Sequence, residues 1–301
     1  MTFKQFSGIV ELRTKIVSVS TYLISLLYSL YSAGSVSPLL AGLVFLSALA
    51  VDMGTTGFNS YFDWYRNVDD ERFNREDAKV LVHEGVSPGS ALLVSVLCYL
   101  FAMVVGFIII VLTSPLVLLF GALSLLVGFF YSGGQRPISS TPLGEFFSGG
   151  FLGLVFFVIN YLVLTGHVSW QAVLVALPQT LAIGAILSVN NACDMRGDAE
   201  AGRKTLAIVL GPVGAEILVY MEGLAGLAGL VLLALWGLLP LLAAWLVLPA
   251  AILLIREYLL MHKRGYSHET KGPNMQSISR IFMIQSLVYI LALLSSVLHL
   301  W

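Results

Sequence analysis

Charge is scarce in this 301-residue sequence, in which Asp, Glu, Lys and Arg together make up 11% of the residues and apolar residues 58%. A soluble domain of this size needs polar residues to cover the part of its surface that folding does not bury. A mean hydropathy of +0.90 leaves too few of them. The lack of charge therefore excludes an ordinary soluble globular protein and predicts a chain embedded in lipid.

Cysteine and net charge are also low. The two cysteines, Cys98 and Cys193, lie in or beside apolar segments without metal-ligand or disulfide spacing, so we interpret both as packing residues. The net charge of −1 gives no basic surface for nucleic acid, and nothing points to an obligate protein partner. No small-residue cleavage site follows the first apolar run, so this run is expected to remain in the protein.

Nine apolar stretches are long enough to cross the hydrocarbon core of a bilayer, which takes roughly 20 residues each. Their limits are about 16–34, 38–58, 91–112, 115–132, 145–165, 170–190, 211–235, 238–257 and 277–299. Lipid cannot satisfy backbone groups left outside a helix, so these stretches predict an all-α polytopic membrane protein. We expect one domain, 1–301, formed by a bundle of nine transmembrane helices.

Lys and Arg are missing from every second connection. All 16 lie before the first stretch, after the second, fourth, sixth and eighth, or at the adjoining helix ends. The positive-inside rule then places the N-terminus and these four loops in the cytoplasm and the C-terminus outside. An odd number of spans meets this requirement, and the membrane is expected to be the plasma membrane.

Two acidic motifs follow the second and sixth stretches. Each places an Asn at the end of an apolar helix, with an Asp three to five residues later and another Asp beyond it. The first runs from Asn59 through Asp63 to Asp69, and the second from Asn190 through Asp194 to Asp198. Because residues four apart share a helix face, Asp194 and Asp198 can direct their carboxylates at one point.

Carboxylates grouped in this way suit Mg²⁺, whose remaining ligands are commonly phosphate oxygens and water. Arg66, Arg203 and Lys204 lie among the acids and would contact a phosphorylated ligand, and Arg136 adds a third cytoplasmic element after Tyr131-Ser132-Gly133-Gly134. The alternative for any single residue is an ordinary solvated loop charge. Two matched motifs at equivalent helix ends favour a ligand site.

At these residues the sequence resembles the UbiA superfamily of intramembrane prenyltransferases. The likeness covers nearly the whole chain. The stretch from Asn59 to Asp69 is similar to the first motif of 1,4-dihydroxy-2-naphthoate prenyltransferases of menaquinone synthesis, and the Asn190–Gly211 segment is the more specific of the two. The resemblance implies a central cavity that opens to the cytoplasmic side.

The resemblance also implies a reaction, in which an isoprenyl group passes from its diphosphate to an aromatic acceptor with the help of Mg²⁺. The implied metal ligands are Asp63, Asp69, Asp194 and Asp198. The implied diphosphate ligands are Asn59, Arg66, Arg136, Asn190, Arg203, Lys204 and Lys15, while Tyr131 would face the allylic cation. Two of these have alternatives, because Tyr131 is equally typical of an interfacial belt and Lys15 of the basic flank of a first span.

One departure from the family pattern concerns the metal site. Ser60 stands at the second position of the first motif, where relatives usually have Asp, and Asn67 replaces another common Asp. A weaker or rearranged metal site is expected, with Asp69 and Asp70 as substitutes. Asp52, inside the second stretch near Thr55 and Thr56, is either functional or satisfied within the bundle.

Two other classes of membrane protein are alternatives to a prenyltransferase. A transporter or channel would place charges near the bilayer midplane, whereas nearly all the acids here gather at one face. A CDP-alcohol phosphotransferase would contain Asp-Gly-x-x-Ala-Arg, which is absent. Within the superfamily, another quinone or lipid acceptor remains an alternative.

Overall fold

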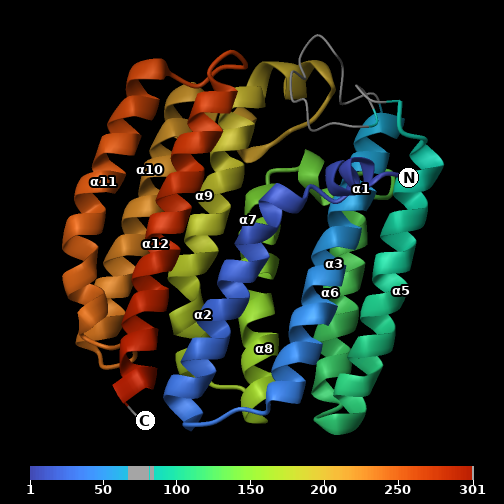
Figure 1. Cartoon of the computed structure of the whole chain (residues 1–301). Coiled ribbons are helices and arrows are strands. Elements are labelled where there is room, and N and C mark those ends of the chain that lie inside the picture. Colours follow the sequence, from blue (N-terminus) through green and yellow to red (C-terminus); the bar gives the residue numbers. More distant parts are fainter. Residues whose placement is uncertain (67–80, 82–84, 300–301) are drawn as a thin grey trace. The chain divides into compact units, whose positions relative to one another are not determined.

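A computed structural model of the chain describes residues 1–66, 81 and 85–299, and every regular element in these ranges is a helix (Figure 1). The helices are α1 (Phe3–Ile9), η1 (Leu12–Lys15), α2 (Ile16–Ala33), α3 (Pro38–Tyr65), α5 (Pro88–Leu112), α6 (Leu116–Ser132), η2 (Ile138–Ser140), α7 (Gly144–Gly149), the π-helical η3 (Gly150–Val155), α8 (Phe156–Thr165), α9 (Trp170–Glu200), α10 (Leu206–Leu235), α11 (Leu242–Arg264) and α12 (Lys271–His299). The predicted all-α class is confirmed.

Length and composition identify this chain as an integral membrane protein. Within the described ranges, eight helical stretches are long and apolar enough to cross a bilayer, with α7, η3 and α8 counted as one. The remaining predicted span is α6, an apolar helix of 17 residues. That length is at the lower end of the range for a spanning helix. The total of nine crossings and the central cavity therefore stay predictions.

Large apolar side chains cover the outer faces of several helices. Phe107 and Val111 of α5 are 66% and 70% exposed, and Trp245 and Ile252 of α11 are 65% and 71% exposed. Soluble proteins rarely expose so much contiguous apolar surface. These faces are therefore suited to contact lipid chains.

The helices form two compact units, of which the first comprises Met1–Val19 and Pro38–Ser140. In this unit α3 packs against α5 and α6 (Figure 1). Gly54 of α3 permits the close approach, because a Cβ there would strike the Tyr99 ring of α5. Phe58 fills the space beside it, with its ring edge-on to those of Tyr99 at 5.0 Å and Phe129 at 5.2 Å.

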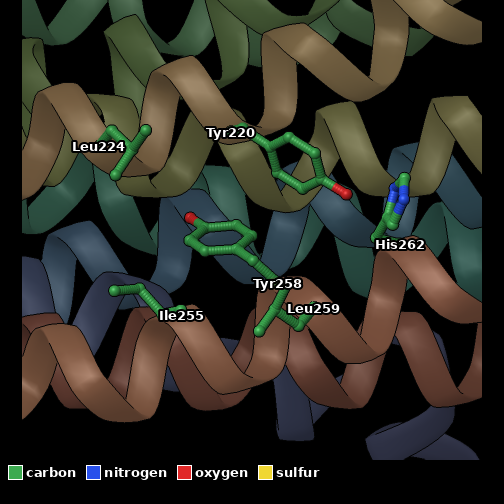
Figure 2. Close-up of a pocket in the computed structure, with 6 residues that line it drawn as sticks. All are labelled: Tyr220, Leu224, Ile255, Tyr258, Leu259 and His262. Carbon is green, nitrogen blue, oxygen red and sulfur yellow. The ribbon is translucent and has the colours of Figure 1, made fainter.

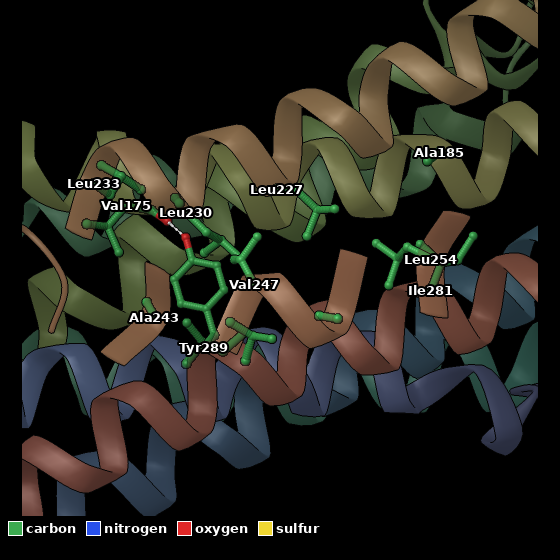
Figure 3. Packing of buried hydrophobic residues seen from close by; sticks show 14 of the residues in the cluster. Val175, Ala185, Leu227, Leu230, Leu233, Ala243, Val247, Leu254, Ile281 and Tyr289 are labelled. Carbon is green, nitrogen blue, oxygen red and sulfur yellow. Dashed lines mark hydrogen bonds between the residues drawn. The ribbon is translucent and has the colours of Figure 1, made fainter. Parts of the chain in front are cut away.

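The second unit comprises Ser20–Ser37 and the chain from Thr141 onward. Its core lies among α9, α10, α11 and α12, which Figure 3 shows interlocking through Val, Leu, Ile and Ala side chains. Tyr289 of α12 is fully buried there and donates its hydroxyl to the carbonyl of Val175 in α9 (Figure 3). Packing of this kind fixes the rotation of α9 and hence the direction in which its last turns project.

Several helices extend beyond the predicted spans. Helix α3 ends at Tyr65 instead of residue 58, and α9 ends at Glu200 instead of residue 190. Hydropathy locates the lipid-facing part of a helix, but backbone hydrogen bonding continues into water when the polar residues that follow accept helical angles. The described parts of both acidic motifs therefore lie on helices.

Candidate functional site

The first motif occupies the last turns of α3, in the first unit. Asn59 and Asp63 are four residues apart and so share a helix face. The Ser132 hydroxyl at the end of α6 donates to Asn59 Oδ1 at 2.7 Å. Asp63 is half-buried and interacts with neighbouring groups. The motif is therefore joined to the end of α6.

Arg66 strengthens this junction. Its guanidinium donates to the Ser132 carbonyl at 2.5 Å and to the Gly134 carbonyl at 2.6 Å, and it lies 5.2 Å from the centre of the Phe62 ring. Gly134 has a φ of +82°, which favours glycine. The sequence predicted that this glycine-containing loop and the motif act together, and within this unit they are in contact.

The remaining residues predicted near the first motif are placed as follows. Tyr131 is half-buried and engaged with neighbouring groups, while Arg136 is exposed. Asp69, Asn67 and Asp70 lie outside the described residues.

Ser60 points away from the shared face of Asn59 and Asp63. It is 4% exposed and donates its hydroxyl to the Ile9 carbonyl of α1 at 3.2 Å. A carboxylate at this position would meet that carbonyl oxygen. In this chain, position 60 secures the N-terminal helix.

Lys15 and Asp52 form a buried pair within the same unit. Lys15 Nζ lies 2.8 Å from Asp52 Oδ1 and 2.6 Å from Thr56 Oγ1, while Ser18 donates to Asp52 Oδ2 at 2.6 Å. Lys15 is only 5% exposed. Of the two alternatives for Asp52, satisfaction inside the bundle is what the structure shows. The role of Lys15 as a diphosphate ligand stays a prediction.

The second motif occupies the C-terminal turns of α9, in the second unit. Asp194 Oδ2 pairs with Lys271 Nζ of α12 at 2.7 Å, and Asp198 Oδ1 pairs with Arg203 at 3.0 Å. Gly202, at φ +75°, turns the chain back so that the Arg203 amide also donates to the Asp198 carbonyl at 2.9 Å. The two carboxylates are thus held one turn apart, each beside a cation.

Asn190 and Lys204 flank this arrangement. Asn190 is half-buried one turn before Asp194, and Lys204 is exposed. Lys204 is therefore accessible to a soluble phosphate group, and Asn190 lies nearer the membrane.

Sequence reasoning missed two residues here. Lys271 was not among the predicted ligands, because it is 77 residues from Asp194 and only the packing of α12 on α9 brings them together. Glu145 of α7 was also overlooked, although it is 4% exposed and accepts a hydrogen bond from Asn191 at 2.8 Å. An acidic residue at the edge of a predicted span is energetically unfavourable in lipid, so its position in the sequence is itself an indication of a functional role.

A pocket in the second unit lies between α10 and α11, and none of the residues of the second motif lines it. Figure 2 shows it lined by Tyr220, Leu224, Ile255, Tyr258, Leu259 and His262. Glu216 accepts hydrogen bonds from Tyr220 at 2.5 Å and from His262 Nδ1 at 2.7 Å. Burial raises the pKa of nearby Tyr266 above its ordinary value, so this hydroxyl stays protonated. The pocket holds none of the predicted site residues.

Oxygen donors dominate the second motif, which suits a hard divalent cation. Within the described residues, no group of three or more His, Cys, Asp or Glu side chains is arranged to hold a metal ion. Two carboxylates with adjacent cations instead match a metal that obtains its other ligands from a bound phosphate. The donor set therefore fits Mg²⁺ that arrives with a diphosphate.

Comparison with known proteins agrees with the fold and the motifs. Residues 18–278 match the UbiA prenyltransferase family. The 1,4-dihydroxy-2-naphthoate octaprenyltransferase of Bacillus subtilis is 34% identical over 172 residues, which are 57% of this chain and 55% of that relative. The enzyme of the same name from Mycobacterium tuberculosis is 29% identical over 213 residues, 68% of this chain and 70% of its own.

A solved structure shows the same fold. The UbiA homologue from Archaeoglobus fulgidus bound to DMAPP and Mg²⁺ aligns with a TM-score of 0.68 at 15% identity, over 97% of this chain and 99% of its own. The family match covers most of the chain, including both motifs as far as Lys271. The chain therefore belongs to the UbiA prenyltransferase family.

Proposed function

We propose that this protein transfers an isoprenyl group from its diphosphate to an aromatic acceptor, 1,4-dihydroxy-2-naphthoate. The observation that carries the proposal is the second motif, in which Asp194 and Asp198 are held one turn apart beside Lys271 and Arg203. The acceptor is inferred from relatives named for it, at up to 34% identity. We place the reaction on the cytoplasmic side of the plasma membrane, in a single nine-span domain.

The proposal assigns Mg²⁺ to Asp63, Asp69, Asp194 and Asp198. It is supported by the all-oxygen donor set of the motifs and by an archaeal relative of the same fold that was solved with DMAPP and Mg²⁺. When bound, the metal supplies Lewis-acid stabilisation of the charge on the departing diphosphate.

The cationic side chains have a separate task, which is to contact the phosphate oxygens. Arg203 and Lys271 already lie beside the second motif, and the exposed Lys204 follows it directly. Charge-assisted hydrogen bonds from such groups are stronger than neutral ones and strengthen further as the leaving group gains charge. Arg66, Arg136, Asn59, Asn190 and Lys15 complete the proposed set.

The reaction also requires that water stay away from the allylic carbon. Helix α9 is buried at Ala182, Ala185 and Val189 on the membrane side of the motif, which keeps bulk water away from this part of the helix. We assign Tyr131 to the allylic cation, whose charge an aromatic ring stabilises when water is excluded.

The test uses the purified full chain in nanodiscs with labelled geranylgeranyl diphosphate, Mg²⁺ and 1,4-dihydroxy-2-naphthoate. Wild type should form a prenylated product that chelator abolishes, and Asp63→Asn and Asp194→Asn should each reduce kcat/KM by at least about 100-fold. Arg196→Gln is the matched control, because this exposed side chain pairs with Glu200, four residues along the same helix. Diphosphate binding without transfer to any aromatic acceptor would refute the acceptor class. Absence of Mg²⁺-dependent binding would refute the prenyltransferase function itself.

A further inference from the structure

Buried polar groups from three helices of the second unit gather one turn below the second motif. Glu145 of α7 accepts a hydrogen bond from Asn191 of α9 through Oε1, while its Oε2 has no hydrogen-bond partner within the described residues. Glu222 of α10 lies beside Ser188 of α9, and its Oε2 is likewise buried and unpartnered there. A buried acceptor without a donor is destabilising, so this cluster is suited to a ligand that donates hydrogen bonds.

The local structure makes room for these acids. Gly184 faces Glu222, since a Cβ at that position would lie 2.9 Å from Glu222 Oε1. Gly149, the last residue of α7, and Gly153, in the π-helical segment that follows, allow this stretch of chain to approach Thr180 of α9 closely. π-Helical turns inside α-helices occur frequently at functional sites. Small residues at these positions therefore allow the two carboxyl groups to pack against α9.

The position of Glu145 relative to the second motif is set by α9. Its partner Asn191 precedes Asp194 by three residues, which is about 4.5 Å along the helix toward the membrane. Arg203, which pairs with Asp198, is close enough to interact electrostatically with Glu145 as well. A diphosphate bound at the motif would have its first prenyl carbon on this membrane side. Glu145 is therefore near the place where an acceptor must attack.

We propose that Glu145, positioned by Asn191, binds a ring hydroxyl of the aromatic acceptor through Oε2 and takes its proton as the new carbon–carbon bond forms. Glu222, which interacts electrostatically with Glu145, adds a second buried carboxyl group to the same cluster, and its unpartnered Oε2 favours occupants that donate hydrogen bonds. The inference rests on the proposed prenyl transfer. It adds the residue that binds the acceptor hydroxyl next to the reacting carbon and takes its proton.

Protons and electron pairs are conserved in this transfer. The hydroxyl proton moves to Glu145, the electron pair of the O–H bond raises the nucleophilicity of the ring carbon, and the ring becomes a ketone as its carbon bonds to the prenyl group. The carbon–oxygen bond to diphosphate breaks, and the diphosphate leaves with that electron pair. Loss of CO₂ from the alkylated carbon leaves its bonding electron pair on the ring as a phenolate, which takes the proton back from Glu145 and restores the aromatic hydroxyl.

The experiment compares Glu145→Gln with wild type, with 1,4-dihydroxy-2-naphthoate and its dimethyl ether as acceptors. A general base contributes about 10²–10⁴-fold. Wild type should therefore prefer the free hydroxyl by at least about 100-fold, and the variant should lose at least about 100-fold in kcat while its affinity for geranylgeranyl diphosphate stays within about twofold. The preference for the free hydroxyl should collapse in the variant, which a purely structural residue would not cause. Glu145→Asp should recover part of the rate.

Asn160→Ala is the control for loss of a buried hydrogen bond, because Asn160 is 1% exposed and donates to Ser25 far from Asp194 in the sequence. It should lower the melting temperature and leave the acceptor preference unchanged. A folded Glu145→Gln protein with wild-type kcat overturns the proposal. If that variant does not fold, the wild-type comparison decides, and equal rates on the two acceptors overturn it. Wild type that prenylates no aromatic compound removes the proposed function and this inference together.

Discussion

Single residues show how one position of a family motif can serve packing in this chain. Sequence alone predicts a weaker metal site where Ser60 replaces Asp, because it cannot show where the side chain points. In the structure Ser60 is buried against the Ile9 carbonyl, while Asn59 and Asp63 share another face of α3. Position 60 is therefore a packing position in this chain.

Replacement of Ser60 by Asp should destabilise the protein. A carboxylate would face the Ile9 carbonyl and be buried without a donor, which costs about 1–3 kcal/mol, more if the group stays charged. Thermal unfolding in detergent should show a lower melting temperature, and the Mg²⁺ concentration that gives half-maximal activity should not fall. Ser60→Ala, which only removes one hydrogen bond, should cost less. A marked gain in Mg²⁺ affinity with Asp at position 60 would place this residue in the metal site.

At the scale of helices, hydropathy located every apolar stretch, but it did not give the ends that bear the chemistry. The last turns of α3 and α9 are polar, so no lipid signal marks them, although the helices continue to Tyr65 and Glu200. The ion pair of Asp194 with Lys271 and the hydrogen bond of Glu145 with Asn191 depend on how α12 and α7 pack on α9. Residue spacing and hydropathy along a single sequence do not reveal how these helices pack on one another.

The break after the second motif depends on one glycine. Helix α10 is interrupted at Gly211, with φ 70° and ψ 174°, just before Pro212. This backbone region is almost restricted to glycine, and a side chain there costs about 1–3 kcal/mol. Gly211→Ala should therefore lower the melting temperature.

The strain in Gly211→Ala should also disturb the turn that begins α10, and with it the position of Arg203. Activity should fall more than in the control Gly42→Ala. Gly42 lies on helix α3, and a methyl group added there meets no atom within 4 Å. Thermal melting and kcat/KM of both variants check this. Equal stability of the two proteins would show that position 211 is not strained.

For the molecule as a whole, the alternation of basic and neutral loops predicts an orientation in the membrane, whereas the helices themselves show only which segments can cross it. The described structure identifies an integral membrane protein with eight clear spanning stretches and the shorter α6. Orientation in the membrane is predicted from the distribution of Lys and Arg. The cytoplasmic N-terminus and the external C-terminus therefore remain predictions.

The buried pair of Lys15 and Asp52 has a consequence for biogenesis. Asp52 lies midway along α3, and an unpaired acid there would cost about 3 kcal/mol on entry into the bilayer. Because its partner precedes the first span, the first two spans should leave the translocon as a hairpin, with the ammonium group neutralising the acid as both enter lipid.

This order of insertion can be followed by translating the first 65 residues with a glycosylation acceptor fused behind them in the presence of microsomes. When both spans insert, the acceptor lies on the cytoplasmic side and stays unmodified. In Lys15→Met, α3 should fail to insert, so the acceptor enters the lumen of the microsomes and the glycosylated fraction rises. The double variant Lys15→Met/Asp52→Leu should restore the native pattern. Identical glycosylation of all three would show that α3 inserts without its partner. If Lys15→Met alone raises the glycosylated fraction, the ion pair between Lys15 and Asp52 determines that the first two spans insert into the membrane together.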